Sequence, residues 1–105
     1  MLNRCVLIGR LTKDPELRYT QSQKAVCAFA IANDTGYGDN KQTNFFDVVV
    51  WGKIGENCAN YLSKGKLVTV DGQLQTRTYE TQDGQKRKVY EIVAQSVDFL
   101  SPKND

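Results

Sequence analysis

Hydrophobic and polar positions alternate along several short stretches of the chain, which is the period of half-buried β-strands. The first stretch is 3–11, NRCVLIGRL, and the turn residues of TKDP follow it. The second, 25–33, is almost wholly apolar, and its Val, Phe and Ile residues favour a strand over an alanine-rich helix. After the glycine-containing loop 34–43 comes the third, 44–53, NFFDVVVWGK. The pattern predicts three strands before any helix.

The period changes to that of a helix within the segment IGENCANYLSKG. Gly65 closes this segment, at the position where helices commonly end. We expect Phe29, Tyr61 and Phe99 to lie in the core, because each belongs to an apolar face of its element. The apolar positions of the predicted helix are Ile54, Cys58, Tyr61 and Leu62.

Two further strands are predicted after the helix, over 67–80 and from 86 onward, with an Asp-Gly hairpin turn between them. Gly9 and Gly72 lie inside strands, where glycine often marks a bend or a bulge. Three strands, one helix and two strands are the elements, in order, of the all-β OB-fold, a five-stranded Greek-key barrel with one short helix. OB barrels commonly bind oligonucleotides or oligosaccharides, so the order predicts a binding module.

At 105 residues the chain is long enough for one hydrophobic core and too short for two. No apolar run approaches the roughly 18 to 20 residues of a membrane-spanning helix. The N-terminus shows no leader with a small-residue cleavage site. We therefore expect a single cytoplasmic domain without a membrane partner.

Composition argues against catalysis and metal binding. The sequence has no histidine, no carboxylate pair placed for acid–base work and no glycine-rich phosphate loop. Its cysteines, Cys5, Cys27 and Cys58, lie apart in apolar surroundings, which predicts buried free thiols. We expect no enzyme, no catalytic residue, no cofactor and no metal site. The net charge of +2 does not by itself identify a polyanion binder.

Segment 44–53 carries aromatic residues on both faces of one predicted strand. A period of two puts Phe45 and Trp51 on one face, and Phe46, Val48 and Val50 on the other. Only one face can line a barrel, so Phe45 and Trp51 point outward if the valines point inward. Such aromatics can be covered by another subunit or a loop, or they can stack on unpaired nucleobases.

Cations near these aromatics favour stacking on nucleic acid. Arg77 and Tyr79 share a strand face, Lys53 closely follows the tryptophan, and the last hairpin carries Lys86–Lys88. Cations that follow phosphates, beside rings that stack on bases, are what a single-stranded nucleic-acid binder needs. DNA and RNA both remain possible, because no residue visibly reads a 2′-hydroxyl. A protein-interaction module with buried aromatics is the alternative from another class.

The sequence resembles the bacterial single-stranded DNA-binding proteins. The resemblance rests on GRLTKDPELRY, WGK, KG and VDGQLQTR in this order, with AVCAFAIA and YEIVAQSVDFLSP around them. It covers 1–102 as one OB-fold domain and leaves 103–105 as a polar C-terminal end. It implies a nucleoid-associated homotetramer that binds and protects single-stranded DNA, without sequence preference, during DNA replication, recombination and repair.

The resemblance also implies which side chains contact DNA. The family stacks bases on aromatics in the loop before the third strand, at both ends of that strand and in the last hairpin. In this sequence those positions are Tyr37, Phe45, Trp51 and Tyr79. The family's basic contacts correspond to Arg18, Lys53, Lys64 and Arg77, and more loosely to Arg4, Arg10 and Arg87.

Two features depart from the family pattern. Asp47 stands where relatives often have a basic residue, so that contact is not carried over. Full-length relatives continue through a flexible linker to an acidic tip that recruits replication and repair proteins, whereas this sequence stops at SPKND. Recruitment through such a tail is not expected from it. The sequence leaves open whether it is a piece of a longer chain or a short paralogous or phage form.

Overall fold

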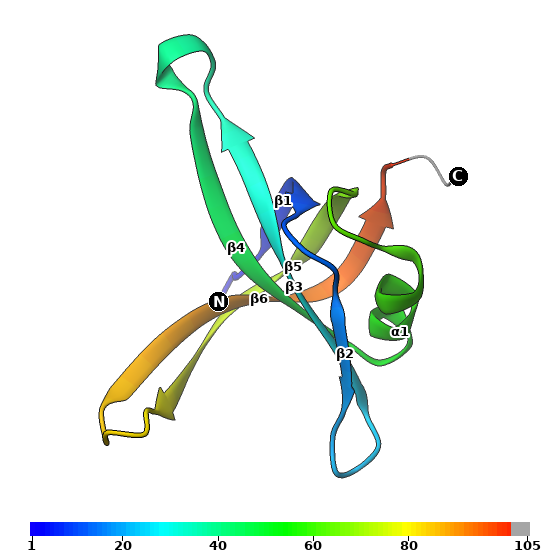
Figure 1. Cartoon of the computed structure of the whole chain (residues 1–105), viewed down its shortest axis with the longest axis vertical. Helices are drawn as coiled ribbons and strands as arrows, with labels where there is room; N and C mark the ends of the chain where they lie inside the picture. Colours follow the sequence, from blue (N-terminus) through cyan, green and yellow to red (C-terminus); the bar gives the residue numbers. More distant parts are fainter. Residues whose placement is uncertain (102–105) are drawn as a thin grey trace.

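A computed structural model describes residues 1–101 as six strands, one α-helix and one 3₁₀ turn (Figure 1). The polar end predicted at 103–105 lies outside the described residues. The described residues include no helix with the length and apolar character needed to cross a membrane. The elements are β1 (Cys5–Leu11), β2 (Glu16–Tyr19), β3 (Ala25–Thr35), η1 (Gly38–Asn40), β4 (Gln42–Trp51), α1 (Gly52–Tyr61), β5 (Leu67–Glu80) and β6 (Lys86–Phe99).

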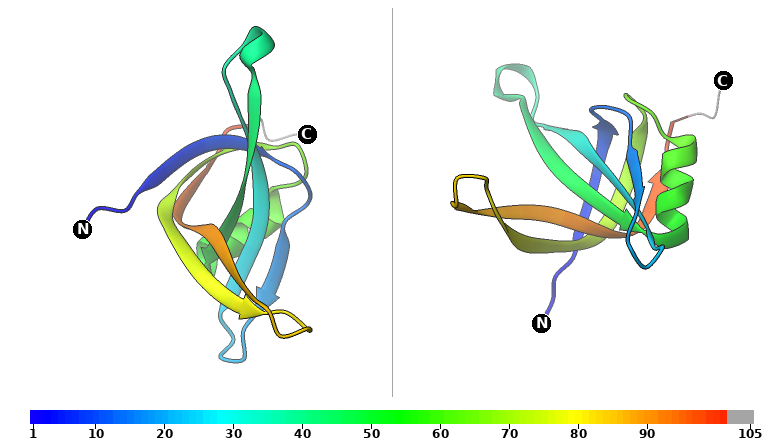
Figure 2. Two further views of the ribbon diagram at one scale, coloured as in Figure 1. Left: turned by 90° about the vertical axis from the view of Figure 1, so that its left-hand side faces the viewer. Right: turned by 60° about the horizontal axis from the view of Figure 1, so that its bottom comes forward.

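Five of the strands close into a barrel. The sheet order is β1-β5-β6-β4-β3, and β1 returns to pair with β3 at Arg10 and Leu11 (Figure 2). This closure confirms the predicted five-stranded OB-fold. The sixth strand, β2, was not among the predicted strands. It has only four residues, too few for a clear alternation, and it is held at the edge of the sheet by pairing with β3.

The barrel interior is filled by alternate residues of each strand. On β3, Cys27, Phe29 and Ile31 point inward and are buried, while the outward positions between them are alanines. The almost wholly apolar stretch 25–33 is therefore a two-faced strand whose outer face is small rather than polar. The buried core comprises Leu11, Cys27, Phe29, Ile31, Val48, Val50, Cys58, Leu62, Val68, Val70, Ile92 and Ala94.

Two of the residues predicted to be core lie on the surface. Phe29 is buried as predicted, but Tyr61 is 63% exposed and Phe99 is 42% exposed. The buried stripe of α1 runs through Gly55 and Cys58, so Tyr61 falls on the rim of the helix. The helix also ends before Gly65, since Leu62 already has an extended backbone. Phe99 is the last residue of β6, and together with Tyr61 it lines an open hollow beside α1.

Glycines allow close backbone approach at two places in the barrel. Gly72 lies at the β-bulge between β5 and β6, which confirms the predicted bend, and a Cβ there would be 2.7 Å from the Cα of Ala94. At Gly9, where β1 crosses toward β3, a Cβ would be 2.7 Å from the carbonyl oxygen of Ala32. A side chain at either position would collide with backbone of the neighbouring strand.

Cysteine accessibility provides a test of the barrel core. Cys27 and Cys58 are fully buried free thiols as predicted, whereas Cys5 is only half-buried. Burial raises the pKa of both core thiols, and that of Cys58 to about 12. Thiolate is the reactive form, so at pH 8 we expect a disulfide reagent to modify Cys5 in the native protein and the core thiols only after unfolding. Rapid reaction of all three thiols in the native state would contradict this packing. Cys5→Ser should abolish the native signal.

Candidate nucleic-acid interface

The outward face of β4 carries two aromatic rings, Trp51 at the end of the strand and Phe45 six residues earlier. Phe45 is 67% exposed and Trp51 is 46% exposed, while Val48 and Val50 between them are fully buried on the opposite face. This confirms the predicted assignment of the two strand faces. The two rings are six residues apart, which in a strand corresponds to about 20 Å between their Cα atoms.

The neighbouring strand β3 forms a low floor beside these rings. Its outward positions Ala28, Ala30 and Ala32 pair with Val49, Asp47 and Phe45 of β4, respectively. The short side chain of Ala32 leaves the ring of Phe45 open to solvent. We call the outward faces of β3 and β4 between Phe45 and Trp51 the binding strip.

Strand pairing sets an arginine across from each ring. Arg18 of β2 pairs with Val26 of β3, which pairs with Trp51. At the other end Arg10 pairs with Ala32, which pairs with Phe45. Two strand spacings amount to about 10 Å, a distance that a long arginine side chain can bridge. Arg10 also donates from Nη1 to the Gly65 carbonyl at 3.0 Å.

The hairpin of β5 and β6 brings a second group of predicted residues together. Tyr79 lies directly opposite Arg87, so a ring and a guanidinium are cross-strand neighbours. Arg77, two residues before Tyr79, donates from Nε to Oε1 of Glu91 at 2.8 Å. The Glu91 side chain is only 14% exposed, and it anchors one edge of the arginine side chain. Arg77 therefore has a protein partner as well as exposed donors.

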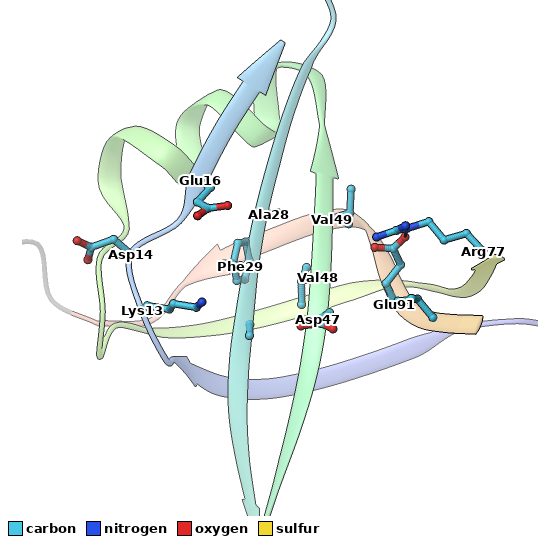
Figure 3. A pocket seen from close by; sticks show the side chains of 12 residues that line it. Lys13, Asp14, Glu16, Ala28, Phe29, Asp47, Val48, Val49, Arg77 and Glu91 are labelled. Atoms are coloured by element: carbon cyan, nitrogen blue, oxygen red, sulfur yellow. Dashed lines mark hydrogen bonds and ion pairs between the residues drawn. The ribbon is translucent and has the colours of Figure 1, made fainter. Parts of the chain in front are cut away.

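A hollow of about 220 Å³ lies between this hairpin and the binding strip (Figure 3). The β5–β6 hairpin lines it with Arg77, Val89 and Glu91. The binding strip contributes Ala28, Ala30, Asp47 and Val49. The segment from β1 into β2 contributes Lys13, Asp14 and Glu16, and the remaining lining residues are Phe29 and Val48.

A second, more open hollow adjoins the tryptophan. Its lining includes Trp51, Lys53, Glu56 and also Lys24, which the sequence analysis did not single out. Glu56 accepts a hydrogen bond from the hydroxyl of Tyr19 at 3.1 Å, and this bond raises the pKa of Tyr19. Lys24 is the last residue of the polar segment TQSQK, which forms the tight turn from β2 to β3. A polar segment of this kind is typical of a turn, and it is the feature of the sequence that could have pointed to Lys24.

The other residues predicted to contact DNA lie away from the binding strip or at its margin. Tyr37, 87% exposed, precedes η1 at the tip of the long β3–β4 hairpin, which projects from the barrel (Figure 1). The backbone N–H of Lys64 donates to Oδ1 of Asp14 at 2.9 Å, which puts this lysine beside a residue of the first hollow. Arg4 lies at the opposite end of β1 from Arg10, and its guanidinium pairs with Asp71 at 2.8 Å. The structure therefore does not bring Arg4 to the binding strip.

Sequence comparison finds one matching family and close bacterial relatives. Residues 2–100 match the Single-strand binding protein family. Single-stranded DNA-binding protein A of Bacillus subtilis (strain 168) is 52% identical over 107 residues, which cover 99% of this chain and 62% of that protein. Single-stranded DNA-binding protein 2 of Staphylococcus aureus (strain Mu50) is 54% identical, with 99% of this chain and 76% of that protein covered. The chain thus spans only part of these relatives.

Structural comparison agrees with the barrel topology. A Plasmodium falciparum SSB, solved in complex with ssDNA, superposes with a TM-score of 0.87 at 28% sequence identity. The superposition covers 96% of this chain and 96% of that chain. The similarity extends over nearly the whole barrel.

Proposed function

The chain belongs to the single-strand binding protein family, and on this premise we propose that it binds and protects single-stranded DNA without sequence preference. The process served would be DNA replication, recombination and repair in the cytoplasm, at the nucleoid, and residues 1–102 would act as one non-catalytic binding domain. The observation that carries this proposal is the binding strip, on which Phe45 and Trp51 each have an arginine two strands away.

The mechanism combines base stacking with phosphate neutralisation. Exposed rings accept bases of any identity on their faces, because every base has a π-face. Cations beside the rings attract the phosphates and release counterions from them. The proposed stacking residues are Tyr37, Phe45, Trp51 and Tyr79, and the proposed phosphate contacts are Arg18, Lys53, Lys64, Arg77 and Arg87.

Salt dependence tests the electrostatic part of this mechanism. The logarithm of the association constant for oligo-dT should fall linearly with the logarithm of salt concentration, with a slope of about −0.7 for each phosphate neutralised. Lys53→Ala should weaken binding and make the slope shallower by about 0.7. Arg4→Ala is the matched control, since Arg4 is held by Asp71 and should leave the slope unchanged. Fluorescence anisotropy of labelled oligo-dT gives the slope, and an affinity insensitive to salt would contradict the mechanism.

We further propose that the chain assembles with itself as a homotetramer. Strand β1 pairs with β3 only through Arg10 and Leu11, so its earlier residues leave one edge without a strand partner among the described residues. Val6 and Ile8 point outward along this stretch and are about half exposed. An open strand edge with apolar side chains favours association with another strand. Light scattering at several protein concentrations would give the mass, and a monomer throughout would contradict the proposal.

A further inference from the structure

Asp47 occupies the middle of the binding strip. It lies two residues after Phe45 on the same outward face of β4, opposite Ala30, and it lines the first hollow (Figure 3). Its side chain makes no hydrogen bond or ion pair with any other side chain in residues 1–101. By contrast, two other carboxylates of the hollow are engaged, Asp14 by the Lys64 amide and Glu91 by Arg77.

A strand of DNA stacked on both Phe45 and Trp51 would pass over this carboxylate. The rings bind base faces, so the bases between them also turn toward the sheet and the phosphates toward the cations outside. A phosphate close to Asp47 would be repelled, which further favours a base edge at this position. The hollow is smaller than the roughly 300 to 1,000 Å³ of typical small-molecule pockets, so it suits one flat group at a time.

A carboxylate only accepts hydrogen bonds, so it distinguishes bases by their donors. The edge of guanine offers two adjacent donors, N1–H and N2–H, which match the two oxygens of a carboxylate. Cytosine and adenine each offer one amino group. Thymine offers only N3–H, with a carbonyl oxygen on each side that the carboxylate would repel.

Building on the proposed function, we propose that Asp47 reads the edge of the base above the hollow and favours guanine over thymine there. The binding protein then has a local base preference within an otherwise sequence-independent contact. The preference depends on the carboxylate at that position, because a basic side chain has no acceptor and a neutral amide offers one oxygen where the carboxylate offers two. Arg77, which lines the same hollow, forms its ion pair with Glu91 and not with Asp47.

Three oligonucleotides of equal length test the preference at one salt concentration. They are all-thymine, alternating thymine-guanine and alternating thymine-inosine, the last of which lacks only the guanine 2-amino group. The unmodified protein should bind the guanine sequence about tenfold more tightly than all-thymine, the lower range for a bidentate base contact, with inosine in between. Asp47→Asn should remove the preference, because its amide replaces one acceptor by a donor that faces the guanine donors.

Asp98→Asn is the matched control. Asp98 is an exposed carboxylate near the end of β6, paired in register with Thr69 and outside both hollows, so its loss should leave the ratio of affinities unchanged. If Asp47→Asn changes all three affinities by the same factor, Asp47 acts only by repelling DNA and the inference is overturned. Equal binding of the three sequences by the unmodified protein also overturns it, while the proposed function stands. If the unmodified protein binds none of the three sequences, both this inference and the proposed function are overturned.

Discussion

Replacing Trp51 with alanine is expected to weaken binding of oligo-dT by about 1 to 3 kcal/mol, the range measured for a single base stacked on an aromatic ring. Trp51 is the only tryptophan of the chain, and it stands at the end of the binding strip, with Lys53 in the adjoining hollow and Arg18 two strands away. Its fluorescence should therefore be quenched on titration with oligo-dT and recover at high salt. Anisotropy of labelled oligo-dT measures the affinity independently of this signal.

Two variants separate stacking from other effects of removing a large ring. Trp51→Phe keeps a ring and should retain most of the affinity. Tyr61→Ala removes a ring of comparable exposure from α1, outside the binding strip, and should leave the affinity unchanged. If Trp51→Ala instead lowers the mass of the assembly while oligo-dT still binds normally, the ring is an interface residue and the stacking role is wrong.

Gly72→Ala should destabilise the barrel by about 3 kcal/mol, the upper range for inserting one methyl group into a packed interior. The added Cβ would collide with the carbonyl oxygen of Val93 and lie 2.7 Å from the Cα of Ala94. Both contacts are backbone atoms of β6, so no side-chain rotation can relieve them. At fixed protein concentration, thermal unfolding followed by circular dichroism should shift downward by on the order of 15 °C.

Gln73→Ala provides the control for this substitution. Gln73 is the next residue along β5 and is exposed, so its truncation should change the unfolding temperature little. An unchanged midpoint for Gly72→Ala would mean that the bulge between β5 and β6 opens without cost. In that case the register assigned to this hairpin would be wrong.

Local patterns were sufficient to predict the strands that form the barrel wall. The alternation in 44–53 sorted the side chains of β4 into two faces, because the faces of a strand follow directly from a period of two, and the structure then showed which face is outward. The Asp-Gly pair predicted the turn of the last hairpin, since the conformation of such a turn depends only on adjacent residues. The short strand β2 and the rim position of Tyr61 were missed, because both depend on the elements packed beside them.

The sequence by itself determined the barrel class, the grouping of Phe45 and Trp51 on one strand face, and the buried thiols Cys27 and Cys58, since each follows from short-range periodicity and composition. Only the tertiary structure decided which cations stand beside which rings. Arg18 lies two strands from Trp51 in the register of three paired strands, and Glu91 holds Arg77 across a hairpin. These contacts join residues far apart in the chain, and their partners follow from strand register, which no local pattern of residues specifies.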